Sequence, residues 1–172
     1  MLKRINILSI VSEHFQTLRS LNQTSKKIFW GDVIVFFILP ISIAGVLTCK
    51  KVDILSQVSN LIAAISILGG FLFNLLAIIY GAMDKLKIDS ENNVLKKTFM
   101  KEIHTNISYS ILTSIAIIVF LIIYSFEFPK ENIYDWIKKG LLFINYFLLI
   151  HFFLTLLMVL NRIYILFKKD IE

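Results

Sequence analysis

Four long uncharged stretches alternate with charged segments along this 172-residue chain, at residues 33–49, 54–83, 105–126 and 140–161. Each comes close to or exceeds the roughly 17 to 25 residues with which a helix, rising about 1.5 Å per residue, crosses a hydrocarbon core of about 30 Å. A membrane barrel would instead need many segments of about ten residues with alternating character. The pattern therefore predicts an all-α membrane protein whose four transmembrane helices cover about residues 31–50, 56–83, 105–127 and 138–162.

The amino-terminal segment has a different pattern, which is amphipathic. At 100° per residue over 7–27, one arc is apolar and also contains His14: Ile7, Ile10, Val11, Phe15, Leu18 and Leu21. The opposite arc is polar. We therefore expect residues 1–29 to form a cytoplasmic, basic, amphipathic helix outside the bilayer. Residues 30–172 would form the transmembrane domain, with a cytoplasmic hairpin at 84–104.

Composition and charge agree with this topology. The chain is 57% hydrophobic and 17% charged, with a net charge of +6 and a mean hydropathy of +0.76. Thirteen of its 18 lysines and arginines fall on the side shared by the two ends and the middle loop. Because cationic loops are retained in the cytoplasm, both termini are expected to be cytoplasmic. The excess of positive charge is therefore explained better by topology than by nucleic-acid binding.

Small and polar residues form one stripe along the second span: Ser56, Ser59, Ala63, Ser66, Gly70 and Ala77, with Asn60 and Asn74 beside them. The opposite face is apolar and suits lipid: Val58, Leu61, Ile65, Leu68, Leu72, Leu75, Leu76 and Ile79. Such a stripe permits close helix packing. In an oligomer it could instead line a hydrated pore, for which the candidates are Ser59, Asn60, Ser66, Gly70 and Asn74.

Three cations lie on one edge of the amino-terminal helix if that helix is continuous. Arg4, Arg19 and Lys26 come within about 60° of one another, with Gln23 nearby. A helix lying on anionic lipid headgroups would have this arrangement. Copies gathered around an axis would instead form a positive ring able to hold a polyanion. The candidate ligand-binding residues are Arg4, Arg19, Gln23 and Lys26.

Two further residues in the spans have a possible mechanical or gating role. Pro40 removes a backbone donor in the first span, which frees the carbonyl near Phe36 and predicts a kink. His151 is the readily ionisable side chain nearest the middle of a span, in a stripe with Thr155, Met158 and Arg162. It is either a functional group or a neutral imidazole bonded to a nearby Ser or Thr.

Several other residues are expected to have structural roles. Asp53 is placed to cap the second span, and the single Cys49 is expected to be an inert, buried thiol. The aromatic residues near the span ends are expected to lie at headgroup level: Trp30, Tyr80, Tyr109, Tyr124 and Trp136.

The sequence also argues against two classes of function. Every Asp and Glu is placed at or beyond a span boundary, which disfavours proton-coupled transport. The chain contains no Gly-rich phosphate loop, metal-ligand cluster or nucleophile–base motif. We therefore expect no catalytic residues, no metal ligands and no cofactor, and predict that the protein is not an enzyme.

Two segments carry a resemblance: FQTLRSLNQTSKKIFWGDVIVFFILP at Phe15–Pro40 and GGFLFNLLAIIYGAM at Gly69–Met83. The chain resembles the small four-span membrane effectors of bacterial anti-phage systems, most closely the Hailong membrane effector. The resemblance implies a homotetrameric ion channel in the bacterial inner membrane, whose amino-terminal helices form an electropositive ring. It also implies a single-stranded DNA oligomer, made by a partner nucleotidyltransferase-like protein, that holds the channel shut. The ring would be built from Arg4, Arg19 and Lys26.

Three functional hypotheses remain open. The first is an oligonucleotide-gated channel acting as a defence effector. The second is a holin-like or toxin pore without a ligand, whose amino-terminal helix lies on lipid. The third is a non-conducting membrane scaffold in which the polar stripe only packs.

Overall fold

A computed structural model describes residues 6–18, 30–86, 94–126 and 132–171, and these are helical throughout apart from short connections. Helix α1 covers Ile7–Thr17, and the first span is built from α2 (Trp30–Val33), a π-helical turn (Ile34–Ile38) and α3 (Leu39–Cys49). A 3₁₀ turn at Leu55–Gln57 leads into α4 (Val58–Leu86), which is followed by α5 (Val94–Ser125) and α6 (Asn132–Ile171). Within the described residues there is no β-strand.

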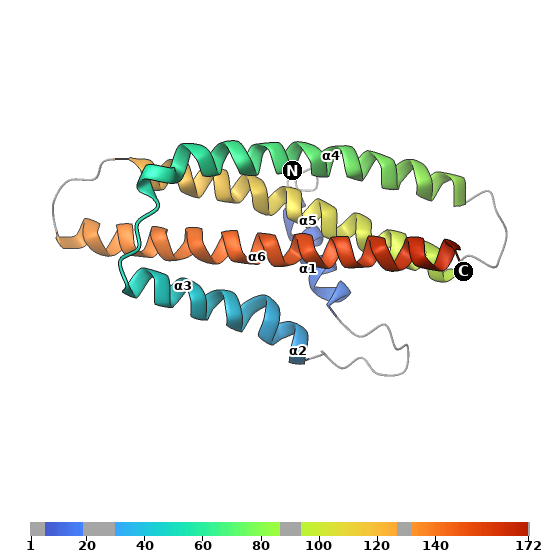
Figure 1. Cartoon of the computed structure of the whole chain (residues 1–172), viewed down its shortest axis with the longest axis horizontal. Coiled ribbons are helices and arrows are strands. Elements are labelled where there is room, and N and C mark those ends of the chain that lie inside the picture. The colour runs from blue at the N-terminus through green and yellow to red at the C-terminus, as the bar shows by residue number, and fades with distance from the viewer. Residues whose placement is uncertain (1–5, 19–29, 87–93, 127–131, 172) are drawn as a thin grey trace.

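Four helical segments are long and apolar enough to cross a membrane: Gly31–Cys49, Leu55–Met83, Thr98–Ser125 and Tyr134–Leu166. The predicted class, an all-α multi-pass membrane protein, is confirmed. Figure 1 shows α3, α4, α5 and α6 running along the long axis of the molecule. In this bundle α5 packs against both α4 and α6, and α3 packs against α6.

The contact between α4 and α5 follows a seven-residue repeat. Val58, Ile65, Leu72 and Ile79 are all buried, and the next positions of the same face are partly buried against the core: Leu61, Leu68, Leu75 and Leu76. A repeat of seven residues keeps one seam of a helix against its neighbour. The expectation that this face meets lipid is therefore wrong, because the apolar face is the one that α5 covers.

Gly69 lies where α4 closely approaches α5. A Cβ added at Gly69 would lie 3.2 Å from the Ser114 hydroxyl of α5, whereas one at Gly70 meets nothing within 4 Å. Gly69→Leu is expected to destabilise the monomer in detergent by about 1–3 kcal/mol through overpacking. Gly70→Leu is the matched control and should leave that stability unchanged. Equal losses in the two variants, measured by denaturant titration, would contradict the packing described here.

One expected consequence of Pro40, the freed carbonyl near Phe36, is confirmed. The π-helical turn at Ile34–Ile38 precedes it directly, and the carbonyl oxygen of Phe36 accepts a hydrogen bond from Nδ1 of His151, at 2.9 Å. Since proline has no N–H to donate, that carbonyl is available to a side chain of α6. The first span is thereby tied to the middle of α6.

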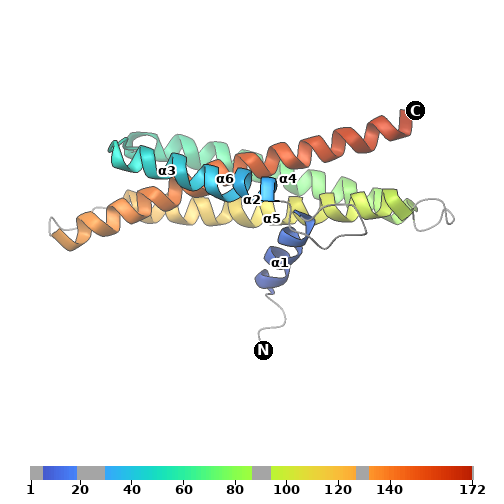
Figure 2. The same ribbon diagram turned by 90° about the horizontal axis from the view of Figure 1, so that it is seen from below.

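Asn6 is the N-cap of α1, and its side chain accepts from the Ser9 N–H at 3.3 Å. The helix ends at Thr17 with Leu18 as its C-cap. It packs against α5, and Figure 2 shows it leaving the bundle at a steep angle to the other helices. The amphipathic segment is thus not independent of the transmembrane bundle. The predicted helix over residues 1–29 is described only as far as this end of α1, and residues 19–29 lie outside the described residues.

Some of the expected structural roles are corrected. Trp136 and Tyr80 are exposed, as residues at headgroup level should be, but Tyr124 is buried and donates to the Asp53 carboxylate at 2.6 Å. Asp53 also accepts from the Leu55 N–H at 2.9 Å, so its predicted capping role is confirmed. Cys49 is exposed rather than buried.

Candidate functional site

The polar stripe of α4 is exposed in the single chain. All five candidate pore residues lie on the outer surface of the bundle: Ser59, Asn60, Ser66, Gly70 and Asn74. Large apolar side chains beside them are exposed as well, among them Ile67 at 61% and Phe71 at 66%. Asn60 donates to the Gln57 side chain within its own segment. The structure therefore gathers the predicted pore residues on one face that no other described element covers.

The candidate ligand-binding residues are not placed by the structure. Arg4, Arg19, Gln23 and Lys26 all lie outside the described residues. The ring of cations stays a prediction from the sequence.

The structure assembles a second polar group of residues, around His14 of α1, which we call the α1 network: His14, Thr17, Phe36, Glu102, Asn106, Tyr109, His151 and Arg162. His14 is fully buried, and its Nδ1 lies 2.8 Å from Oδ1 of Asn106. Its ring stacks on Tyr109 with centroids 3.8 Å apart and planes 2° from parallel. Burial lowers the pKa of His14 to about 4, despite the opposing Asn106 hydrogen bond. The imidazole is thus neutral at physiological pH.

The network continues from Tyr109 through His151 to the first span. The Tyr109 hydroxyl oxygen lies 2.8 Å from Nε2 of His151, and Nδ1 of His151 faces the Phe36 carbonyl. A carbonyl oxygen only accepts, so Nδ1 carries the proton and Nε2 accepts from the tyrosine hydroxyl. His151 is therefore a hydrogen-bonded imidazole, but its partners are a tyrosine and a backbone carbonyl rather than the expected Ser or Thr.

Arg162 joins the end of α1 to both α5 and α6. One of its terminal nitrogens pairs with Oε2 of Glu102 at 2.7 Å, and the other donates to the Thr17 carbonyl at 2.7 Å. The two side chains are only 13% and 16% exposed. A guanidinium at the last carbonyls of a helix satisfies acceptors that the helix leaves unpaired and complements its dipole. Glu102 lies within the apolar segment Thr98–Ser125, so it is not beyond a span boundary as expected.

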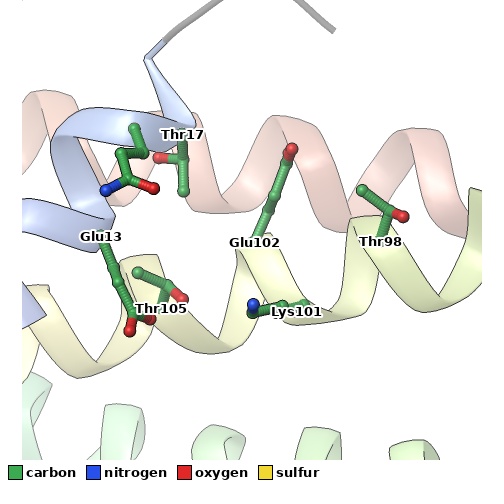
Figure 3. Close-up of a pocket in the computed structure, with 7 residues that line it drawn as sticks. Glu13, Thr17, Thr98, Lys101, Glu102 and Thr105 are labelled. Carbon is green, nitrogen blue, oxygen red and sulfur yellow. The ribbon is translucent and has the colours of Figure 1, made fainter. Parts of the chain in front are cut away.

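An open cavity of about 190 Å³ borders this junction. Figure 3 shows Glu13 and Thr17 of α1 facing it from one side, and Thr98, Lys101, Glu102 and Thr105 of α5 from the other. The lining is polar and of mixed charge, and the described residues contain no cluster able to hold a metal ion. The contact between α1 and α5 is thus accessible at this cavity, whereas His14 is fully buried.

Sequence reasoning identified His151, Arg162 and the carbonyl of Phe36, but not the residues of α5 that connect them. A signal for these existed, since Glu102, Asn106, Tyr109 and Thr113 recur at spacings of three or four residues and share one face. Their partners on other elements come from α1 and α6, which spacing alone does not reveal.

No protein family, curated protein or solved structure was found to match this chain.

Proposed function

We propose that this protein is an oligomeric ion channel of the bacterial inner membrane, with both termini in the cytoplasm, that acts as an anti-phage defence effector. A single-stranded oligonucleotide, made by a partner nucleotidyltransferase-like protein, would bind the amino-terminal ring and keep the pore shut. The observation that carries the proposal is the exposure of the polar face of α4, while its apolar face is buried against α5.

The physical argument starts from the cost of polar groups in lipid. A membrane helix normally turns its apolar face to hydrocarbon, because unpaired amide groups there cost several kcal/mol. In α4 one apolar face is already occupied by α5, and Asn60 and Asn74 are exposed on the outward face beside Ile67 and Phe71. Copies of the chain arranged with α4 innermost, in a tetramer, would place these two residues as rings of neutral dipoles about 21 Å apart along a hydrated path.

The α1 network supports a role for the amino-terminal helix in gating. It connects α1 by hydrogen bonds to α5 and α6. His14 also stacks on Tyr109, whose hydrogen bond to His151 leads on to the π-helical turn of the first span. A ligand that binds α1 would therefore influence the positions of the bundle helices, because α1 contacts them through this network. The amino-terminal cations Arg4, Arg19 and Lys26, with Gln23, would hold the polyanion itself.

Ion flux in liposomes tests the pore. Gly70→Leu is expected to lower the flux about tenfold or more, because a ring of leucines makes a dewetting constriction. Gly45→Leu is the matched control, since Gly45 also has no neighbour within 4 Å but lies on the first span. A protein that passes no ions in any state, including after removal of residues 1–28, would be a scaffold instead of a channel.

Charge reversal tests the ligand. Arg19→Glu with Lys26→Glu is expected to abolish binding of a short single-stranded DNA to the detergent-purified protein, because cations at the ring supply the attraction. Lys168→Glu with Lys169→Glu reverses the same charge on the same side and should retain binding. The ligand-gated proposal fails if the wild type binds no oligonucleotide at low salt, or if binding survives reversal at Arg19 and Lys26.

A further inference from the structure

The end of the bundle away from the α4–α5 hairpin contains a cavity of about 360 Å³. It lies between the α3–α4 connection and the first turns of α6, and Tyr124 of α5 also lines it. Three lysines line this cavity: Lys51, Lys138 and Lys139. Nothing in the proposed channel function uses them.

None of the three ammonium groups forms a close ion pair with a carboxylate among the residues that the structure describes, although the charge of Lys138 helps to lower the pKa of the Asp53 carboxyl. Lys138 lies 5.6 Å from the centroid of the Tyr124 ring, and Lys139 lies 5.1 Å from that of Trp136. Such ring contacts hold a cation in place without neutralising its charge. The cavity therefore retains cations able to bind an anion.

The backbone places Lys51 at a conformational cost. Lys51 has a φ of 54°, the one positive φ found at a non-glycine position in the described residues. The Val52 N–H donates to the Leu47 carbonyl at 3.1 Å and the Lys51 N–H to the Thr48 carbonyl at 3.0 Å. This is a Schellman ending of α3 with lysine at the position where glycine is preferred. Glycine would suit this turn better, so the lysine at position 51 indicates a role for its side chain.

Thr48 provides a neutral polar group at the same cavity. Its hydroxyl oxygen is buried and has no hydrogen-bond partner, although Thr48 lines the cavity. Buried polar atoms are normally paired, so an orphaned hydroxyl beside a cavity indicates an absent partner. A hydroxyl can donate to a phosphate oxygen.

Two carboxylates also line the cavity, and they do not cancel its charge. Asp53 accepts from the Tyr124 hydroxyl and from the Leu55 N–H, and the tyrosine hydrogen bond lowers the pKa of its carboxyl. Asp135 is the second. Three ammonium groups against two carboxylates leave one net positive charge, which matches a singly charged phosphodiester.

The position of the cavity relative to the membrane surface indicates the source of such a phosphate. Trp136 is 74% exposed in the first turns of α6, and exposed tryptophan at a span end is typical of headgroup level. We propose that the cavity formed by Thr48, Lys51, Lys138 and Lys139 binds the phosphate of an anionic lipid in the adjacent leaflet. The proposal does not depend on ion conduction.

The test compares lipids on the purified, delipidated full-length protein. Phosphatidylglycerol is expected to raise the Tm more than phosphatidylcholine does and to be retained in native mass spectra. Lys51→Gln with Lys138→Gln should weaken that retention about tenfold, as expected for two lysines near anionic headgroups. Lys50→Gln with Lys101→Gln removes equal charge outside the cavity and should change it less than twofold by the same reasoning.

Two outcomes overturn the proposal. Equal weakening in both pairs of variants would show a nonspecific effect of net charge. A Tm rise with millimolar inorganic phosphate but none with phosphatidylglycerol would assign the site to free phosphate instead of a lipid. Lys51→Gly separates binding from folding, because glycine suits the turn: this variant should keep the Tm measured in neutral detergent and show a weaker response to phosphatidylglycerol.

Discussion

Arg162→Met is expected to cost about 3–5 kcal/mol of stability and to release α1 from the bundle, as is typical when one partner of a buried ion pair is removed. The substitution leaves the Glu102 carboxylate without its partner at 2.7 Å. It also removes the donor to the Thr17 carbonyl at the end of α1. Methionine keeps the apolar length of the side chain, so the loss reports the charge and the hydrogen bonds rather than a cavity.

Denaturant titration and limited proteolysis of α1 measure the two effects. Arg162→Met combined with Glu102→Gln removes both charges and should recover part of the stability, because no unpaired carboxylate remains. The double variant should still release α1, since Thr17 stays uncapped. If the two substitutions are additive in stability, the pairing of Arg162 with Glu102 is not the source of the effect.

Acidification is expected to release α1, through His14. Its pKa is about 4 when docked, against 6.5 when exposed, with burial as the main cause. Because the undocked state binds the proton more tightly, docking is fully favourable above pH 6.5 and weakens as the pH falls towards 4. The total loss is about 3 kcal/mol at 1.36 kcal/mol per pKa unit.

The groups that face His14 do not offer the charged imidazole a neutralising partner. Tyr109 and Asn106 of α5 contact it directly, and His151 and Arg162 of α6 both act to lower its pKa. Glu102, the acid of the α1 network, is already paired with Arg162. Protonation of His14 therefore favours the state in which α1 is released from the bundle.

Hydrogen exchange of the α1 amides at neutral pH and at about pH 5 measures this response. His14→Gln should abolish most of the pH dependence, whatever it does to the absolute stability of docking. His104→Gln removes a half-exposed histidine of α5 and should leave the pH dependence intact. Protection of α1 that is independent of pH in the wild type would contradict a neutral, buried His14.

The transmembrane helices and the carbonyl freed by Pro40 could be predicted because each depends on local sequence. Long apolar runs between charges define the spans, and proline frees a carbonyl in any helix that contains it. The end of α1 at Thr17 could not be predicted in this way. The amphipathic pattern continues beyond it, and the described helix ends where Arg162, 145 residues away in sequence, donates a hydrogen bond to the Thr17 carbonyl.

The faces of α4 show most clearly what required tertiary structure. Periodicity correctly separated a polar stripe from an apolar face, because side chains three, four and seven residues apart share one side of a helix. It assigned the apolar face to lipid, whereas the structure buries that face against α5 and exposes the stripe. Lipid and the interior of a protein are equally apolar, so hydrophobicity alone cannot distinguish a face that meets lipid from one that meets a helix. The same limit applies to the α1 network, whose residues come from four segments and become partners only through packing.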